Sequence, residues 1–207
     1  MEVVVVHQYK GKLIIHTGSM FSGKTSSLEK DVKRFNIAGY KTVAFKPTVD
    51  TRFKSSDIIS HDEMSIEAIL VKDIQNIKSY CENINPEVIA IDEIQFLDGE
   101  IKDIINTITE FLSRDITVIV AGLDVDFEGR PFEIVKELMP IADYLTKHHA
   151  VCVKCGSDAW ISHRKTKDKE RVVIGASREY EPLCRHCYLK EKKEEDAIIN
   201  KNQVTLL

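Results

Sequence analysis

The chain has 207 residues, of which 43% are hydrophobic and 30% are charged; this composition is that of an ordinary globular protein and excludes a disordered chain. The formal net charge of −4 argues against an extended nucleic-acid-binding surface, which needs a basic excess. No apolar run reaches the roughly 20 residues of a membrane span, and the opening residues lack the basic segment of a secretory signal. We therefore expect a cytoplasmic protein with no nucleic-acid or membrane partner.

The first expected elements surround a phosphate-binding motif. Lys12–His16 is a short apolar run that predicts a buried strand, and a helix is expected from Thr25 to about Ala38, since apolar residues follow at helical spacing. The intervening loop fits the P-loop pattern G-x-x-x-x-G-K-[ST] at every position. Its residues, which we expect to cradle a nucleoside triphosphate, are Gly18, Ser19, Met20, Phe21, Ser22, Gly23, Lys24 and Thr25.

Strands and helices alternate along the chain as far as about Tyr144. The expected elements are, in order, a strand over Thr42–Phe45, short strands around Ile58–Ser60 and Ile66–Val71, a helix over Asp73–Cys81, a strand over Val88–Ile91, a helix from about Glu100 to Arg114 and a strand over Thr117–Ala121. Such alternation predicts a parallel sheet covered by helices on both faces. Cys81, alone on a helix, is expected to be a small buried hydrophobe.

Two carboxylates follow the buried run Val88–Ile91. Ligands of open α/β sheets bind at the carboxyl ends of the strands, so Asp92 is expected to hold Mg²⁺ together with the Thr25 hydroxyl, while Lys24 contacts the β- and γ-phosphates. Glu93 can then take a proton from the attacking nucleophile, which is a substrate hydroxyl in a kinase and water in an ATPase.

Four of the five cysteines form two C-x-x-C pairs, Cys152 with Cys155 and Cys184 with Cys187. In a reducing compartment this pattern predicts four thiolates on one structural Zn²⁺. His186 inside the second pair is the alternative fourth ligand, and a redox C-x-x-C is the competing function. The separation exceeds that of a simple zinc pattern, so an insertion is expected there: a hairpin of Ala159–Lys165 with Arg171–Ile174, then a loop over Gly175–Leu183.

These patterns predict a P-loop nucleotide-binding domain over residues 1–143, a zinc-binding domain over 144–192 and a charged, flexible tail over 193–207.

The chain resembles the small zinc-containing thymidine kinases over nearly its whole length, from Gly11 to about Lys190. The motifs that carry the resemblance are the P-loop, Asp50-Thr51-Arg52, Asp92-Glu93-Ile94-Gln95-Phe96, Gly122-Leu123-Asp124 with Phe127 and Pro131-Phe132, both C-x-x-C pairs, and Val173-Ile174-Gly175 with Tyr180. Asp-Glu-x-Gln-Phe joined to the zinc knuckles is specific to this family. Ser19 departs from the proline of many relatives, as do Ser26, Ser27 and Lys30 from residues common there, and none of the four has a catalytic role.

The resemblance implies a RecA-like P-loop domain, a zinc-ribbon-like domain with a lasso loop, and ATP- and Mg²⁺-dependent phosphorylation of the 5′-hydroxyl of thymidine and deoxyuridine in nucleoside salvage for DNA synthesis. It also implies feedback inhibition by thymidine triphosphate and a homotetramer. Glu93 would be the general base, with Lys24 and Arg52 also catalytic. Further nucleotide contacts would come from Asp50, Thr51, Arg52, Asp92, Glu93, Ile94 and Gln95. Thymidine would be contacted by Met20, Phe96, Leu123, Phe127, Phe132, Arg171, Val172, Val173, Ile174, Gly175 and Tyr180.

Two other classes of protein share these features. A nucleic-acid-dependent ATPase also combines a RecA-like domain with a zinc ribbon, but the acidic charge and the absence of a basic and aromatic stripe disfavour it. A protein-interaction module with a structural nucleotide site is the third reading, and Glu93 beside Asp92 argues instead for turnover.

Overall fold

The computed structural model describes residues 10–48, 57–59, 65–166 and 179–204. The chain divides into two compact units. The first is drawn from Met1–Thr17, Lys24–Asp124 and Phe132–Lys147, and the second from Gly18–Gly23, Val125–Pro131 and His148–Leu207. The expected boundary after residue 143 differs from this division, which also assigns most of the P-loop to the second unit. The domain boundaries therefore remain predictions.

A six-stranded sheet forms the centre of the first unit, with the strand order β5-β2-β6-β7-β1-β8. Its strands are β1 (Leu13–Gly18), β2 (Thr42–Pro47), β5 (Ile69–Val71), β6 (Val88–Ile91), β7 (Thr117–Gly122) and β8 (Tyr144–His148). Every pairing from β5 to β1 is parallel. Asp143, just before β8, donates its N–H to the carbonyl of Leu13 at the start of β1 at 3.0 Å, and His148 at the end of β8 lies against Gly18 at the end of β1. The edge strand therefore runs in the same direction as β1. The predicted parallel sheet is confirmed.

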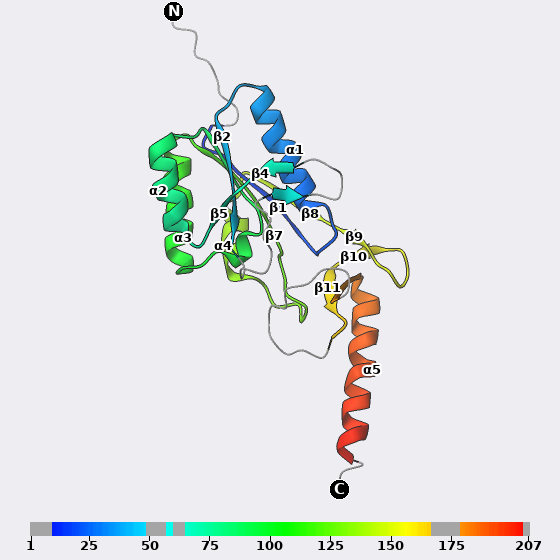
Figure 1. Ribbon diagram of the computed structural model, residues 1–207. Helices are drawn as coiled ribbons and strands as arrows, with labels where there is room; N and C mark the ends of the chain where they lie inside the picture. The colour runs from blue at the N-terminus through cyan, green and yellow to red at the C-terminus, as the bar shows by residue number, and fades with distance from the viewer. Residues whose placement is uncertain (1–9, 49–56, 60–64, 167–178, 205–207) are drawn as a thin grey trace, which may run out of the picture. The chain divides into compact units, whose positions relative to one another are not determined.

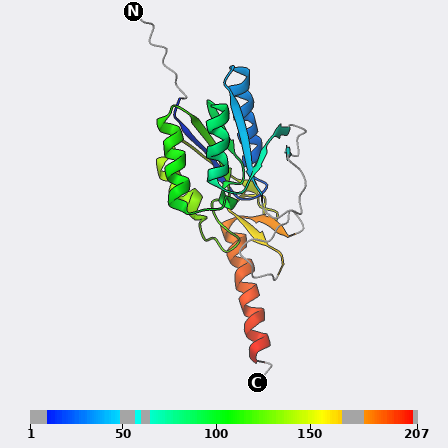
Figure 2. The same cartoon turned by 60° about the vertical axis from the view of Figure 1, so that its left-hand side comes forward.

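Helices cover both faces of this sheet (Figures 1 and 2). α1 (Lys24–Ile37) packs against β2, β6 and β7, whereas α2 (Ile74–Ile84) packs against β5, and α3 (Ile101–Ser113) against β7 and α4 (Glu133–Leu138). The short helices η1 (Ile94–Phe96) and η2 (Met139–Ile141) follow β6 and α4. Asp73 caps α2 by accepting a hydrogen bond from the N–H of Asn76 at 2.9 Å, which satisfies one free donor of its first turn.

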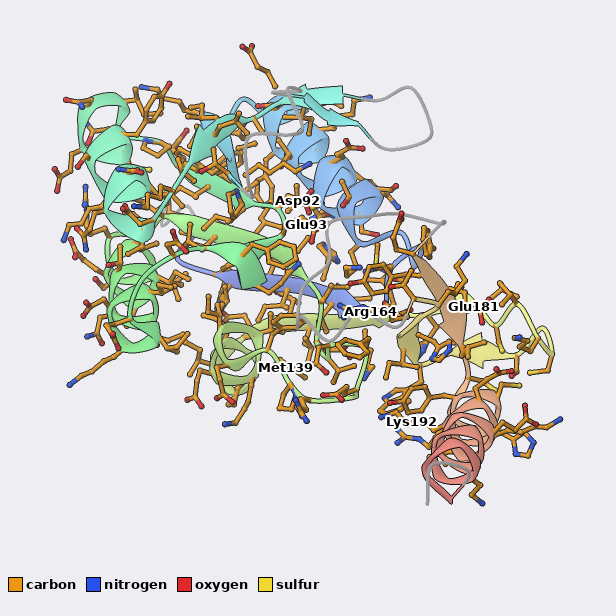
Figure 3. All side chains as sticks on the ribbon, turned by 60° about the horizontal axis from the view of Figure 1, so that its bottom comes forward. Asp92, Glu93, Met139, Arg164, Glu181 and Lys192 are labelled. Carbon is orange, nitrogen blue, oxygen red and sulfur yellow. The ribbon has the colours of Figure 1, made fainter. Side chains whose placement is uncertain are left out.

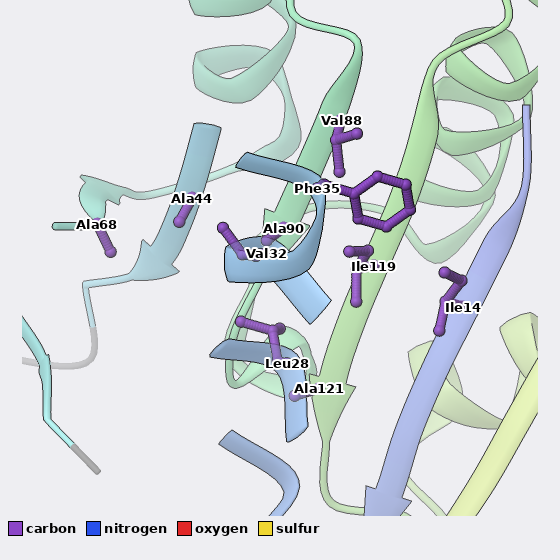
Figure 4. Close-up of a cluster of buried hydrophobic side chains, with 10 residues drawn as sticks. All are labelled: Ile14, Leu28, Val32, Phe35, Ala44, Ala68, Val88, Ala90, Ile119 and Ala121. Atoms are coloured by element: carbon purple, nitrogen blue, oxygen red, sulfur yellow. The ribbon is translucent and has the colours of Figure 1, made fainter. Parts of the chain in front are cut away.

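Alternate residues of the central strands build two apolar layers, because successive side chains of a strand point to opposite faces. One layer packs under α1 and is drawn in Figure 4; its members are Ile14, Leu28, Val32, Phe35, Ala44, Ala68, Val88, Ala90, Ile119 and Ala121.

Cys81 on α2 is 1% exposed, and burial raises the pKa of its thiol to about 12. The prediction that Cys81 is a small buried hydrophobe is confirmed.

One polar pair joins strand β1 to helix α1. His16 Nε2 lies 3.0 Å from Asp31 Oδ2, and His16 is only 7% exposed. Burial alone would raise the pKa of Asp31, but the hydrogen bond and charge of His16 outweigh it, with smaller help from Arg34, so the pKa lies below its ordinary value. The helix that follows the P-loop is therefore held to the strand that precedes it by a buried polar contact.

Outside the large sheet, the described residues form small antiparallel pairs. β3 (Asp57–Ile59) pairs with β4 (Ser65–Glu67), so the expected strand over Ile66–Val71 is two strands, β4 and β5, interrupted at Ala68. In the second unit, β9 (Ala150–Val151) pairs with β10 (Asp158–Ala159), and β11 (Ile161–Arg164) with β12 (Tyr180–Leu183).

The structure of the second unit differs from the sequence-based expectation at two places. The loop expected over Gly175–Leu183 was wrong for residues 180–183, which form β12 and pair with β11; the expected partner strand Arg171–Ile174 lies outside the described residues. α5 spans Arg185–Val204 and continues through the boundary expected at residue 193. The core of this unit consists of Ala150, Cys152, Ala159, Ile161, Leu183, Cys184 and Tyr188.

Candidate active site and metal centre

The P-loop begins where β1 ends, and its backbone requires glycine at the first position. Gly18 has φ +135°, and a Cβ there would lie 2.1 Å from the carbonyl oxygen of His148. No other residue fits such an approach. Further along the loop, Phe21 has φ 63°, and the Ser22 hydroxyl donates to the Ser19 carbonyl at 2.7 Å. The loop therefore has a defined turn conformation of its own.

Lys24 and Thr25 open α1 and lie beside the carboxylates at the end of β6. Lys24 is 7% exposed; burial lowers the pKa of its ammonium, and the negative charges of Glu93, Asp92 and Asp124 oppose that shift. The Thr25 hydroxyl lies 3.2 Å from Asp92 Oδ1 and 3.3 Å from Oδ2. One lysine, one hydroxyl and three acids thus gather at the carboxyl edge of the sheet.

Asp92 is the most deeply buried of these acids, at 2% exposure. Burial and the neighbouring Glu93 raise its pKa to about 7, while Lys46 on β2 partly opposes them. A buried carboxylate of this kind, next to a hydroxyl and a second acid, is stabilised by a bound cation. The donor set formed by Asp92 and Thr25 therefore fits Mg²⁺.

Glu93 directly follows Asp92 (Figure 3) and adopts a left-handed conformation, with φ 51° and ψ 40°. A non-glycine residue in this region carries backbone strain, which accumulates at functional sites. The Gln95 amide donates to Glu93 Oε2 at 2.5 Å, and its oxygen accepts the N–H of Leu123 at 3.0 Å. A Cβ on Gly122 would lie 2.7 Å from that oxygen. Gln95 thereby orients the carboxylate of Glu93 and ties the ends of β6 and β7 together.

The aromatic residues expected to contact thymidine fall in both units. In the first, the rings of Phe96 and Phe132 meet edge to face at 6.3 Å between centroids. In the second, the ring of Phe127 lies under the guanidinium of Arg164, and Tyr180 is buried on β12. Met20 also belongs to this unit, and its N–H donates to the Ser162 hydroxyl at 2.8 Å.

Four cysteines of the second unit are positioned to bind a metal ion. The sulfur atoms of Cys152, Cys155, Cys184 and Cys187 all lie within 4.8 Å of one another, and a tetrahedral Zn²⁺ with Zn–S bonds of 2.3 Å needs spacings of about 3.8 Å. The N–H of Cys187 lies 3.4 Å from Cys184 Sγ, and this bond is the largest influence that lowers the pKa of the Cys184 thiol to about 6. All five cysteines are free of disulfides.

Two groups of expected contact residues lie outside the described residues, namely Asp50, Thr51 and Arg52, and Arg171 to Gly175. Ile94 is fully buried on η1, and its side chain is part of the core.

The structure also draws attention to residues that were given no role from the sequence. Lys147 on β8 places Nζ 2.6 Å from Asp124 Oδ2, and Asp124 is 7% exposed just beyond β7. Lys46 lies near the end of β2 and Asp124 follows β7. This position at the carboxyl end of a parallel strand was the signal that could have given both a role, and Asp124 had been quoted only as part of the Gly122-Leu123-Asp124 motif. Ser162 and Arg164 had no such signal, because they belong to the insertion between the cysteine pairs.

A parallel sheet with a glycine loop, a buried lysine and a hydroxyl after β1, and an acid after β6, defines a P-loop nucleotide-binding protein. The family model for thymidine kinase matches residues 11–188, and the chain belongs to the thymidine kinase family. The thymidine kinase of Bacteroides thetaiotaomicron is 41% identical over 186 residues, covering 90% of this chain and 91% of that protein. Those of two Bacteroides fragilis strains are 40% identical with the same coverage.

A more distant likeness concerns the fold alone. The crystal structure of the flagellar accessory protein FlaH from Methanocaldococcus jannaschii matches with a TM-score of 0.50 at 15% identity, covering 72% of this chain and 75% of that one. Among the residues that the structure describes, no helix has the length and apolar character needed to cross a membrane.

Proposed function

We propose that this chain transfers the γ-phosphate of ATP to the 5′-hydroxyl of thymidine. Lys24 binds the β- and γ-phosphates, and the Thr25 hydroxyl and Asp92 hold Mg²⁺, which supplies charge neutralisation at the phosphates. Glu93 accepts the proton of the 5′-hydroxyl as its oxygen attacks phosphorus. The observation that carries this proposal is the Glu93 carboxylate, oriented by Gln95 at 2.5 Å beside the buried Asp92.

The roles of the remaining site residues are also proposals. The P-loop residues and Asp50, Thr51 and Arg52 contact ATP, with Arg52 assisting phosphoryl transfer. The side chains that contact the thymidine are Met20, Phe96, Leu123, Phe127, Phe132 and Tyr180, and the main chain of Arg171 to Gly175 reads the edge of the pyrimidine. Backbone donors and acceptors reject cytosine strongly, because the wrong base leaves buried polar groups unpaired.

A nucleoside panel with labelled ATP tests the activity. We expect phosphorylation of thymidine and deoxyuridine, and none of deoxycytidine or purine deoxynucleosides. ATP consumption that requires DNA and no nucleoside would favour the nucleic-acid-dependent ATPase. Binding of ATP with no turnover under either condition would favour a structural nucleotide site.

Four cysteines within reach of one ion predict one Zn²⁺ per chain. Cys152 and Cys184 belong to the core of the second unit, so loss of the ion should loosen that core as well as the site. Elemental analysis should give one zinc in the native protein and in Cys81→Ala, whose cysteine lies in the first unit, and much less in Cys184→Ser. A zinc-free native protein with full activity would contradict a structural role.

Thymidine triphosphate should act as a feedback inhibitor. It joins the pyrimidine of one substrate to the triphosphate tail of the other, so both ends bind with a single loss of translational freedom. Inhibition kinetics should show competition with thymidine and with ATP. Lys24→Ala should weaken this inhibition strongly, whereas Lys30→Ala, an exposed lysine on the same helix, should leave it unchanged. Inhibition that does not compete with thymidine would refute a shared site.

The cellular setting and assembly are proposed by analogy with the family. The proposed role is the supply of DNA precursors by nucleoside salvage in the cytoplasm, and the proposed assembly is a homotetramer. Light scattering that gives a monomer at every concentration, with and without ATP, would contradict the tetramer.

A further inference from the structure

A buried arginine in the second unit touches two of the residues assigned to thymidine binding. Arg164 ends β11 (Figure 3) and is 4% exposed. Its Cζ lies 3.7 Å from the centroid of the Phe127 ring, and its Nη2 donates to the Tyr180 hydroxyl at 2.8 Å. Arg164 and Tyr180 face each other in the register of β11 and β12.

The main chain around Phe127 is held by hydrogen bonds from neighbouring residues. The Asp126 carboxylate accepts the N–H groups of Glu128 at 3.0 Å and Arg130 at 2.9 Å. The Tyr188 hydroxyl donates to the Phe127 carbonyl at 3.2 Å. These hydrogen bonds hold the backbone of Phe127, and the stacked guanidinium bears on the orientation of its ring.

The guanidinium suits this position in a way that an apolar side chain or a lysine does not. It is planar, so one face can stack on an aromatic ring while its edge donates hydrogen bonds in fixed directions. A lysine ammonium has no plane and cannot make both contacts with the same geometry. Burying a charge is costly, and filling the space would need only a methionine. The two contacts therefore have a use beyond packing.

We propose that Arg164 is a positioning residue for thymidine, which fixes the Phe127 ring and the Tyr180 hydroxyl in one arrangement before the nucleoside binds. This inference rests on the proposed function. Preorganisation of this kind removes an ordering cost from binding, so Arg164 sets the affinity for thymidine and leaves the phosphate end of the site unaffected.

A double-mutant cycle on the full-length, zinc-loaded protein tests the proposal, with thymidine and ATP dissociation constants measured by calorimetry. Arg164→Lys should weaken thymidine binding by about 10- to 100-fold, with ATP binding and kcat at saturating thymidine nearly unchanged. Tyr180→Phe should also weaken thymidine binding. The double variant should be no weaker than Arg164→Lys alone, because the Tyr180 hydroxyl acts on thymidine through its bond to the guanidinium, which Arg164→Lys has already removed.

Arg185 provides the matched control. Its Cζ lies 3.9 Å from the centroid of the Trp160 ring in the same unit, and Arg185→Lys should leave thymidine affinity unchanged. Normal thymidine affinity in Arg164→Lys, an equal loss of thymidine and ATP affinity, or additive effects in the cycle would overturn the proposal. If Arg164→Lys does not fold, Tyr180→Phe decides, and wild-type affinity in that variant overturns it. A wild-type protein that binds no thymidine would instead refute the proposed function.

Discussion

Glu93→Gln should lower kcat by about 10²–10⁴-fold, with ATP and thymidine affinities nearly unchanged. Glutamine keeps the size and the hydrogen-bonding reach of the side chain but cannot accept the proton of the 5′-hydroxyl. The effect should therefore fall on the chemical step and not on KM. Single-turnover kinetics with pre-bound substrates measure that step directly.

The control for this change is Glu100→Gln, the same substitution at an exposed position of the first unit, for which we expect wild-type kcat. Near-normal turnover in Glu93→Gln would remove Glu93 from the role of general base. The strained backbone at Glu93 would then need another explanation.

Asp92→Asn should abolish Mg²⁺-dependent turnover and at the same time make the nucleotide-free protein more stable at pH 8. The pKa of Asp92 is raised from 3.8 to about 7 in the folded protein, so the folded state binds more protons than the unfolded state between these values. Stability therefore falls as pH rises from about 4 to 7. Three pH units correspond to at most roughly 4 kcal/mol, and an asparagine does not incur this loss.

Urea unfolding at pH 5 and pH 8, with metal and nucleotide removed, checks the sign. At pH 5 the stability difference between the variant and the wild type should be only about a third of that at pH 8, because most of the window between the unfolded and folded pKa values of Asp92 lies above pH 5. At pH 8 the variant should be the more stable of the two. Asp98→Asn, an exposed position nearby in the chain, should show no such difference, and a destabilised Asp92→Asn at pH 8 would contradict the account.

The strands that the sequence predicted well are those buried on both faces. Val88–Ile91 matches β6 at both ends, because four consecutive apolar residues are typical of a central parallel strand. β8 was not predicted, since Tyr144 to Lys147 are exposed at the edge of the sheet and their side chains show no apolar pattern. A strand can be predicted from the sequence to the extent that its side chains are buried and therefore apolar.

Strand β12 was not predicted for a different reason. Glu181 and Pro182 are residues that local sequence patterns assign to a loop. A proline is nevertheless tolerated in an edge strand, and β11 is the only described partner of β12. The long-range pairing of residues 161–164 with residues 180–183 carries no local signal.

The candidate site divides in the same way. Lys24, Thr25, Asp92 and Glu93 could be predicted because phosphate and metal chemistry dictates their spacing and their place at strand ends. Two contacts could not be predicted: the hydrogen bond between Gln95 and Leu123 and the stacking of Arg164 on Phe127. Each of them joins segments that lie far apart in the chain. Such contacts orient the reactive groups, and only the folded structure brings their members together.

The buried pair of His16 and Asp31 has a consequence for how this sequence can change over time. An apolar replacement at either position alone would leave the other polar group buried with a lost contact, which is costly. An apolar replacement at both positions would restore a continuous hydrophobic layer between β1 and α1. The residues at positions 16 and 31 are therefore expected to vary together among related chains. The strand before the P-loop and the helix after it would then change in a correlated way.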